Sequence, residues 1–216
     1  MNLHILYQDN HLFVVKKEHN VSIDALDEQV KLFLSNQKEK LGYIQRMQKL
    51  DKLTSGIVVY VLTSKAYERL CAQDFVYKYL AVVLGVPKNP SGYFSANVED
   101  LGQGRLGLAP PIKQSYEIDF YYKLLDKCSS ISLIEITKND ENADSIMFGA
   151  MQIGCPVFGD KLYGGDKLAP NTNLALVLYS IELEHPTTHN KLVLKCSPIE
   201  DSKPWSYFNL DKLYKM

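Results

Sequence analysis

The sequence predicts an α+β fold with a mixed, largely antiparallel central sheet and flanking helices. Segments with strand character outnumber segments with helical spacing, and most neighbouring strand segments are close enough along the chain to be antiparallel. No stretch rich in Pro, Gly and Ser divides the chain. We therefore expect residues 1–216 to form a single domain, which a chain of this length can hold together with one core.

The first part of the chain is predicted to place two strands before a helix, and a strand and a helix after it. The two opening runs flank a turn at Asp9-Asn10. A run of mostly β-branched residues ending at Leu62 indicates a buried strand, and Thr63 or Ser64 can cap the helix that follows. The expected elements are strands at 4–7, 12–15 and 57–62, and helices at 24–37 and 63–74.

The rest of the chain is predicted to consist mainly of strands. The expected elements are strands at 79–84, 115–122, 131–136, 174–183 and 191–196, and a helix at 144–153. Residues 88–112 contain three prolines and several glycines, so we expect a loop there. Within it, 102–107 matches GxGxxG, but Leu-Ala-Pro-Pro follows and cannot form the helix that a dinucleotide site needs.

Composition excludes several classes of protein. The 24 basic and 25 acidic side chains leave a net charge of −1. Any electrostatic binding of nucleic acid must therefore come from a local basic face. No apolar run approaches the roughly 20 residues that span a bilayer, and no signal-peptide pattern opens the chain, so we expect a cytoplasmic protein. The four cysteines form no CxxC pair, and Pro186 argues against a helix that would align His185 with His189, so we expect no metal site.

The segment 48–56, Gln-Lys-Leu-Asp-Lys-Leu-Thr-Ser-Gly, carries the most chemical information. It places the Asp51 carboxylate between Lys49 and Lys52, immediately before the apolar strand. The flanking cations favour the ionised form of Asp51, which suits a nucleophile better than an acid. With Arg46 they also form a local basic patch. From the residues alone, the alternative interpretation is a solvated surface turn.

This segment resembles the HRLD-x-x-TSG signature of the RluA-type RNA pseudouridine synthases. Four further segments resemble that family in the same order along the chain: 3–17 its opening strands, 79–87 its YLALVEGVP stretch, 153–164 its IGHPIVGDPLYG stretch, and 185–188 its HP-x-T turn. The resemblance implies the pseudouridine synthase catalytic fold over the whole chain. We also expect no S4-type domain before residue 1.

The resemblance also implies an activity and roles for particular residues. An RNA uridine is isomerised to pseudouridine, in rRNA or tRNA, without metal or cofactor. Asp51 corresponds to the essential aspartate, Tyr79 to the tyrosine that lies against the target base, and Lys49 to an arginine that helps to flip the nucleotide out of the stack. We expect Lys49, Lys52 and Arg46 to contact the RNA.

The chain departs from the family in its charged motifs. The family's KPAG reads Lys-Glu-His-Asn at 17–20, and its GRTHQIR reads Glu-Asn-Ala-Asp-Ser-Ile-Met at 141–147. The arginine that pairs with the family's aspartate is therefore Met147 here, which carries no charge, and Lys49 or Lys52 is a candidate substitute. The alternative to an enzyme is a protein of the same fold with weakened or no activity that acts as an RNA-binding or assembly factor.

Overall fold

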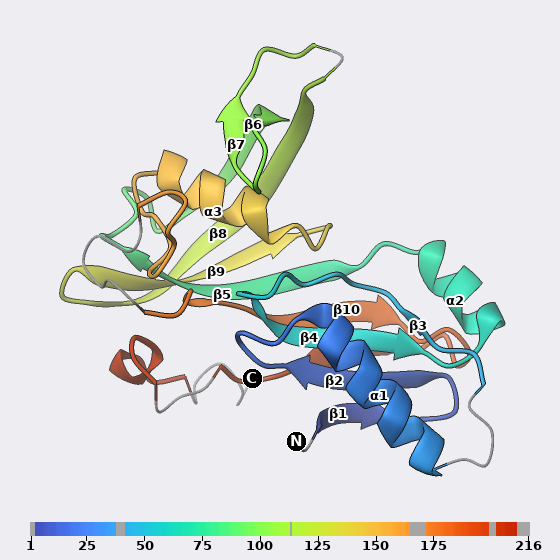
Figure 1. Cartoon of the computed structure of the whole chain (residues 1–216). Coiled ribbons are helices and arrows are strands. Elements are labelled where there is room, and N and C mark those ends of the chain that lie inside the picture. The colour runs from blue at the N-terminus through green and yellow to red at the C-terminus, as the bar shows by residue number, and fades with distance from the viewer. Residues whose placement is uncertain (1–2, 38–41, 113, 165–171, 199–201, 211–216) are drawn as a thin grey trace. The chain divides into compact units, whose positions relative to one another are not determined.

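The computed structural model describes residues 3–37, 42–112, 114–164, 172–198 and 202–210 (Figure 1). The chain divides into two compact units. The first comprises Met1–Tyr77, Asn139–Glu141 and Leu178–Cys196, and the second comprises Lys78–Lys138, Asn142–Val177 and Ser197–Met216. That residues 1–216 act as a single domain stays a prediction.

The first unit contains a sheet covered by a helix. Its elements are β1 (His4–Gln8), β2 (Leu12–Lys17), α1 (Ile23–Gln37), β3 (Gln45–Arg46), β4 (Ser55–Val61), α2 (Ser64–Cys71), most of β10 (Leu176–Glu184) and β11 (Lys191–Lys195). The strand order is β1, β2, β4, β10, with β3 paired to β4 and β11 to β10. The pairs β1/β2, β2/β4, β3/β4 and β10/β11 are antiparallel.

Buried apolar side chains explain why these strands and α1 form. Strand β4 is apolar over Ile57–Val61, and β2 is apolar over its first four residues and ends in two lysines; both strands are nearly fully buried, as expected for strands covered on both faces. Helix α1 buries Ile23, Leu26, Val30 and Leu34, which recur at helical spacing. Figure 1 shows α1 crossing the strands of this unit at an angle, and the ring of Phe33 stacks on that of Phe13 in β2.

In the described part of the chain, the second unit contains a five-stranded sheet with a helix on one face (Figure 1). Its elements are most of β5 (Val76–Leu84), β6 (Ser91–Asp100), β7 (Leu106–Leu108), β8 (Tyr116–Cys128), β9 (Ile131–Lys138), α3 (Ala143–Gln152) and the 3₁₀ turn η1 (Trp205–Tyr207). The strand order is β5, β9, β8, β6, β7. The pairs β6/β7, β6/β8 and β8/β9 are antiparallel.

Helix α3 packs closely on this sheet. Val98, Leu106 and Ile118 form a buried cluster with Phe148 of α3. Gly149 allows the close approach, since a Cβ at that position would lie 2.4 Å from Cε1 of Phe120. No helix among the described residues is long and apolar enough to cross a membrane.

The predicted fold class is confirmed, and most predicted elements are present. The prediction of a loop over 88–112 is wrong, because β6 and β7 occupy much of it. Pro90 lies just before β6, and Pro110 and Pro111 follow β7, so the prolines delimit the hairpin rather than interrupt it. The glycine-rich segment forms the turn between the two strands, and no helix follows it, as predicted.

Candidate active site

The Asp51 carboxylate is fixed by its own turn. The backbone N–H groups of Leu53 and Thr54 donate to Oδ1 at 2.6 and 2.8 Å, and Thr54 Oγ1 donates to Oδ2 at 2.7 Å. Asp51 is exposed, whereas Thr54 is fully buried beneath it. An ionised carboxylate accepts all three bonds and still has acceptor capacity on Oδ2. The turn therefore presents an oriented carboxylate oxygen at the surface of the first unit.

The chain on both sides of this turn is anchored to β4. The side-chain Oε1 of Gln48 accepts from Val59 N at 2.8 Å, and the N–H of Met47 donates to Val59 O at 2.9 Å. Gly56 opens β4 with a φ of +136°, and a Cβ there would lie 2.4 Å from Leu178 O on β10. Only glycine fits that backbone and that spacing. The turn thus rests on the most buried strands of the unit.

Lys17 is a buried cation beneath the Asp51 turn. It is 0% exposed, and its Nζ donates to the carbonyl oxygens of Val21 at 2.9 Å, Glu18 at 3.3 Å and Lys52 at 3.4 Å. Burial lowers the pKa of Lys17 to about 8, against the opposing charges of Asp51 and Glu18. Lys17 is therefore a buried ammonium that interacts electrostatically with Asp51, in addition to the exposed Lys49 and Lys52 on either side of it in the sequence.

His19 follows Lys17 in the same loop. The N–H of Asn20 donates to Lys52 O at 3.0 Å, which ties this loop to the Asp51 turn. Both ring nitrogens of His19 are buried and have no hydrogen-bond partner among the described residues. Burial lowers the pKa of His19, the charge of Lys17 lowers it further, and the charge of Asp51 opposes both effects. The imidazole is therefore neutral near neutral pH.

The predicted RNA-contacting side chains differ in their surroundings. Lys49 and Lys52 are exposed, and neither forms an ion pair with a carboxylate in the described part of the chain. The guanidinium of Arg46 pairs with Asp27 of α1, whose other oxygen accepts from Tyr60 Oη at 2.7 Å. The two lysines thus present free charge at the surface, whereas Arg46 also joins β3 to α1.

Two tyrosines of β5 belong to different units. Tyr79 lies in the second unit and is fully buried, so its predicted place against the target base stays a prediction. Tyr77 lies in the first unit, also buried. Burial raises its pKa well above the ordinary value, and the charges of Glu141 and Asp140 act in the same direction. Tyr77 therefore stays a protonated phenol.

The start of α3, where the family's second charged motif would lie, is built around a helix cap and a buried lysine. Asn142 caps the helix, its Oδ1 accepting from Asp144 N at 2.9 Å and from Ser145 N at 3.4 Å. The Nζ of buried Lys138 donates to Asn142 O at 2.8 Å and also bonds the hydroxyl of Ser145. Met147 is buried in the same helix.

The place of Lys17 and His19 beside the Asp51 turn was not predicted from the sequence. Their signal was the segment 17–20, which aligns with KPAG and keeps its lysine but has histidine in place of alanine. Among the described residues, no group of three His, Cys, Asp or Glu side chains is placed to hold a metal ion. All four cysteines are free, and burial raises the pKa of the Cys196 thiol to about 12.

Sequence comparison finds RNA-modifying enzymes. No family model matches the chain. It is 27% identical over 199 residues to the dual-specificity RNA pseudouridine synthase RluA of Haemophilus influenzae, covering 86% of this chain and 89% of that protein. It is 25% identical over 181 residues to the ribosomal large subunit pseudouridine synthase C of Rickettsia bellii, covering 77% of this chain. The match spans only 58% of the length of the Rickettsia protein.

Structural comparison finds the same fold in two human proteins. RNA pseudouridylate synthase domain containing 1 matches with a TM-score of 0.77 at 19% identity, covering 99% of this chain and 94% of that one. RNA pseudouridylate synthase domain containing 4 matches with a TM-score of 0.73, also at 19% identity, covering 98% and 93%. These likenesses concern the fold, and the resemblance seen in the motifs is confirmed by the sequence relatives.

Proposed function

We propose that this chain, a diverged member of the RluA-type pseudouridine synthase family, is an isomerase that converts uridine to pseudouridine in rRNA or tRNA. The observation that carries the proposal is the Asp51 carboxylate, held by three hydrogen bonds on an exposed turn. That turn is the segment matching the family's signature, and the sequence relatives reported above are named as synthases acting on RNA. Those names favour the enzyme over a protein that only binds RNA.

The proposed reaction needs a carboxylate that acts either as a nucleophile or as a base. The N1–C1′ bond of uridine breaks, the uracil turns while it is held, C5 bonds to C1′, the proton on C5 leaves, and N1 takes up a proton from solvent, so that the net change is an isomerisation. Asp51 acts either as a nucleophile or as a base, and the geometry suits both, because Oδ2 keeps acceptor capacity. The target base must first leave the stack, at a cost of a few kcal/mol in a duplex.

Lys17 supplies the positive charge that Met147 cannot. Its ammonium lies beneath the turn and donates to the carbonyl of Lys52, the residue after Asp51. A buried ammonium is a point charge with fewer geometric constraints than a guanidinium, so it stabilises negative charge on Asp51 without a bidentate contact. We expect Lys17 to be a positioning residue rather than a group that touches substrate.

Lys49 and Lys52 are proposed to contact RNA phosphates. Both are exposed and free of carboxylate partners in the described ranges. Replacing each by Ala should lower the salt dependence of RNA binding by about one unit of slope. Arg46 is expected to contribute less to RNA binding, because it pairs with Asp27. A cytoplasmic location, where the four free thiols would stay reduced, is part of the proposal.

Release of tritium from C5-labelled uridine in bulk rRNA and tRNA tests the activity. Wild-type protein should release tritium, and Asp51→Asn should reduce release by at least about 10³-fold, because the amide keeps an acceptor for the turn but not the charge. Asp126→Asn is the matched control, since Asp126 is also exposed and accepts from a nearby backbone N–H at 2.8 Å. Release by wild type no greater than by Asp51→Asn, on both RNAs, would refute the enzyme proposal.

A further inference from the structure

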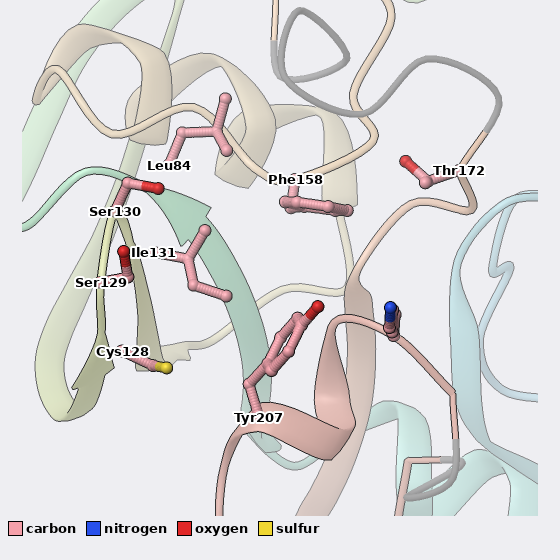
Figure 2. A pocket seen from close by; sticks show the side chains of 9 residues that line it. Leu84, Cys128, Ser129, Ser130, Ile131, Phe158, Thr172 and Tyr207 are labelled. Carbon is pink, nitrogen blue, oxygen red and sulfur yellow. The ribbon is translucent and has the colours of Figure 1, made fainter.

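The second unit contains a pocket of about 500 Å³ that the proposed chemistry does not use. Its apolar part is formed by Leu84, Ile131 and Phe158. Figure 2 shows Phe158 and Tyr207 on opposite sides of the pocket, with Ile131 pointing into the space between them. This volume lies within the usual range of small-molecule sites and accommodates one nucleotide.

Polar groups line the edge of this pocket. The hydroxyls of Ser129 and Ser130 lie on the exposed turn between β8 and β9 and have no side-chain hydrogen bond within the described residues (Figure 2). The turn itself is held in place, because the N–H of Gly85 donates to Ser130 O at 2.7 Å. Two hydroxyls are thus presented on a fixed backbone.

A positive charge and an aromatic ring complete the pocket. Lys203 is exposed, and its Nζ lies 6.0 Å from the centre of the Tyr207 ring. The Tyr207 side chain belongs to η1, where the neighbouring Trp205 is buried, and Tyr207 itself is 48% exposed. Such an exposed aromatic residue beside a cation is a common element of surfaces that bind single-stranded nucleic acid.

We propose that this pocket binds one nucleotide of single-stranded RNA, with the base packed between the rings of Phe158 and Tyr207 and the phosphate at Lys203. The apolar walls and two rings match the faces of a base, the ammonium matches a phosphate, and the hydroxyls of Ser129 and Ser130 reach base or ribose oxygens and nitrogens. The choice of RNA rests on the proposed function. The pocket would add a contact outside the target uridine and so help to select the RNA segment.

Equilibrium dialysis with labelled uridine 5′-monophosphate tests the pocket directly. Wild-type protein should bind it, and a five-residue oligouridylate should compete. Lys203→Met and Tyr207→Leu should each weaken binding about tenfold, because one removes a charge-assisted contact and the other a stacking contact. Trp205 is the only tryptophan of the chain, so its fluorescence reports locally on occupancy.

Matched variants separate this proposal from its alternatives. Lys161→Met and Tyr121→Leu change an exposed lysine and an exposed tyrosine of the same unit that do not line the pocket, and they should bind as wild type does. Asp51→Asn should also keep the binding, so loss of catalysis and loss of the pocket are distinguishable. If ribose 5-phosphate binds with the same affinity as the nucleotide, the base makes no contribution, and the proposal is overturned in favour of an anion site. If the protein binds octanoate but not the nucleotide, the pocket is an apolar site and the proposal is overturned. Nucleotide binding by Lys203→Met as tight as by wild type would overturn it too.

Discussion

The Asp51 turn and the start of α3 correspond to the two charged motifs of the family, and they have diverged differently. At the turn, a carboxylate is exposed and held by three donors, with the buried ammonium of Lys17 beneath it. At the start of α3, Asn142, Ser145 and Lys138 bond to one another and cap the helix. The polar groups at the turn orient an exposed carboxylate oxygen, whereas those at α3 hold the start of the helix. Changes at the turn should therefore alter rate, and changes at α3 should alter stability.

The largest effect is expected for the glycine that opens β4. Gly56→Ala should destabilise the fold by about 4 kcal/mol or more, because a Cβ would meet the Leu178 backbone at a φ of +136°, which alanine strongly disfavours. Urea denaturation measures the change. Gly42→Ala is the control, since nothing lies within 4 Å of a Cβ there. A Gly56→Ala protein as stable as wild type would show that the turn is not fixed by its approach to β10.

Loss of the Lys17 charge should produce the next largest effect. Near neutral pH, Lys17→Met should lower kcat by about 10²-fold through loss of the preorganised charge. In wild type the ammonium deprotonates as pH rises through about 8, so the rate should fall there. The variant should lack this alkaline decline, which the pH profile of tritium release measures.

Stability should change with pH in the opposite direction to rate. The pKa of Lys17 is about 8 in the folded protein and returns to its ordinary 10.5 on unfolding. Between these values the unfolded chain binds more protons than the folded protein, so the contribution of Lys17 to the free energy of unfolding rises with pH. A fall in both rate and stability across this window would attribute the alkaline decline to unfolding instead.

A smaller effect on rate is expected for the hydroxyl that holds Asp51. Thr54→Val removes the donor to Oδ2 and should lower kcat about tenfold, with a loss of about 1–2 kcal/mol in stability because Thr54 is buried. Thr54→Ser keeps the hydroxyl and should retain most of the rate. Equal rates for the valine and serine variants would mean that the backbone donors alone orient the carboxylate.

The smallest effect concerns the α3 region. Asn142→Ala removes the helix cap and should cost about 1 kcal/mol, or about 2–4 °C in Tm, without changing kcat per folded molecule. Asn142→Asp keeps the cap and serves as the control. A tenfold fall in kcat for the alanine variant, measured on fully folded protein, would place this region in the catalytic machinery and remove the contrast between the two regions.

The sequence predicted most of the fold because the strongest elements are locally encoded. The run of β-branched residues in β4 predicts a strand, and the helical spacing of apolar residues in α1 predicts a helix, from neighbouring residues alone. The hairpin of β6 and β7 was missed because few of its residues are buried, so its pattern is not that of a core strand. Its pairing with β8 over Ser91–Val98 is a long-range property.

By itself, the sequence determined that a carboxylate flanked by two lysines precedes a buried strand. Those facts depend only on neighbouring residues and single out Asp51, whereas the resemblance to the family rests on five segments in the same order along the chain. Tertiary structure alone placed a buried cation beneath the turn that carries this carboxylate. Lys17 precedes Asp51 by more than thirty residues, and its ammonium reaches the turn only because β2 pairs with β4 and the loop after β2 bonds to Lys52. The positions of Lys49, Asp51 and Lys52 in the sequence determine that they are neighbours. The burial of the Lys17 charge depends instead on which segments the sheet brings together.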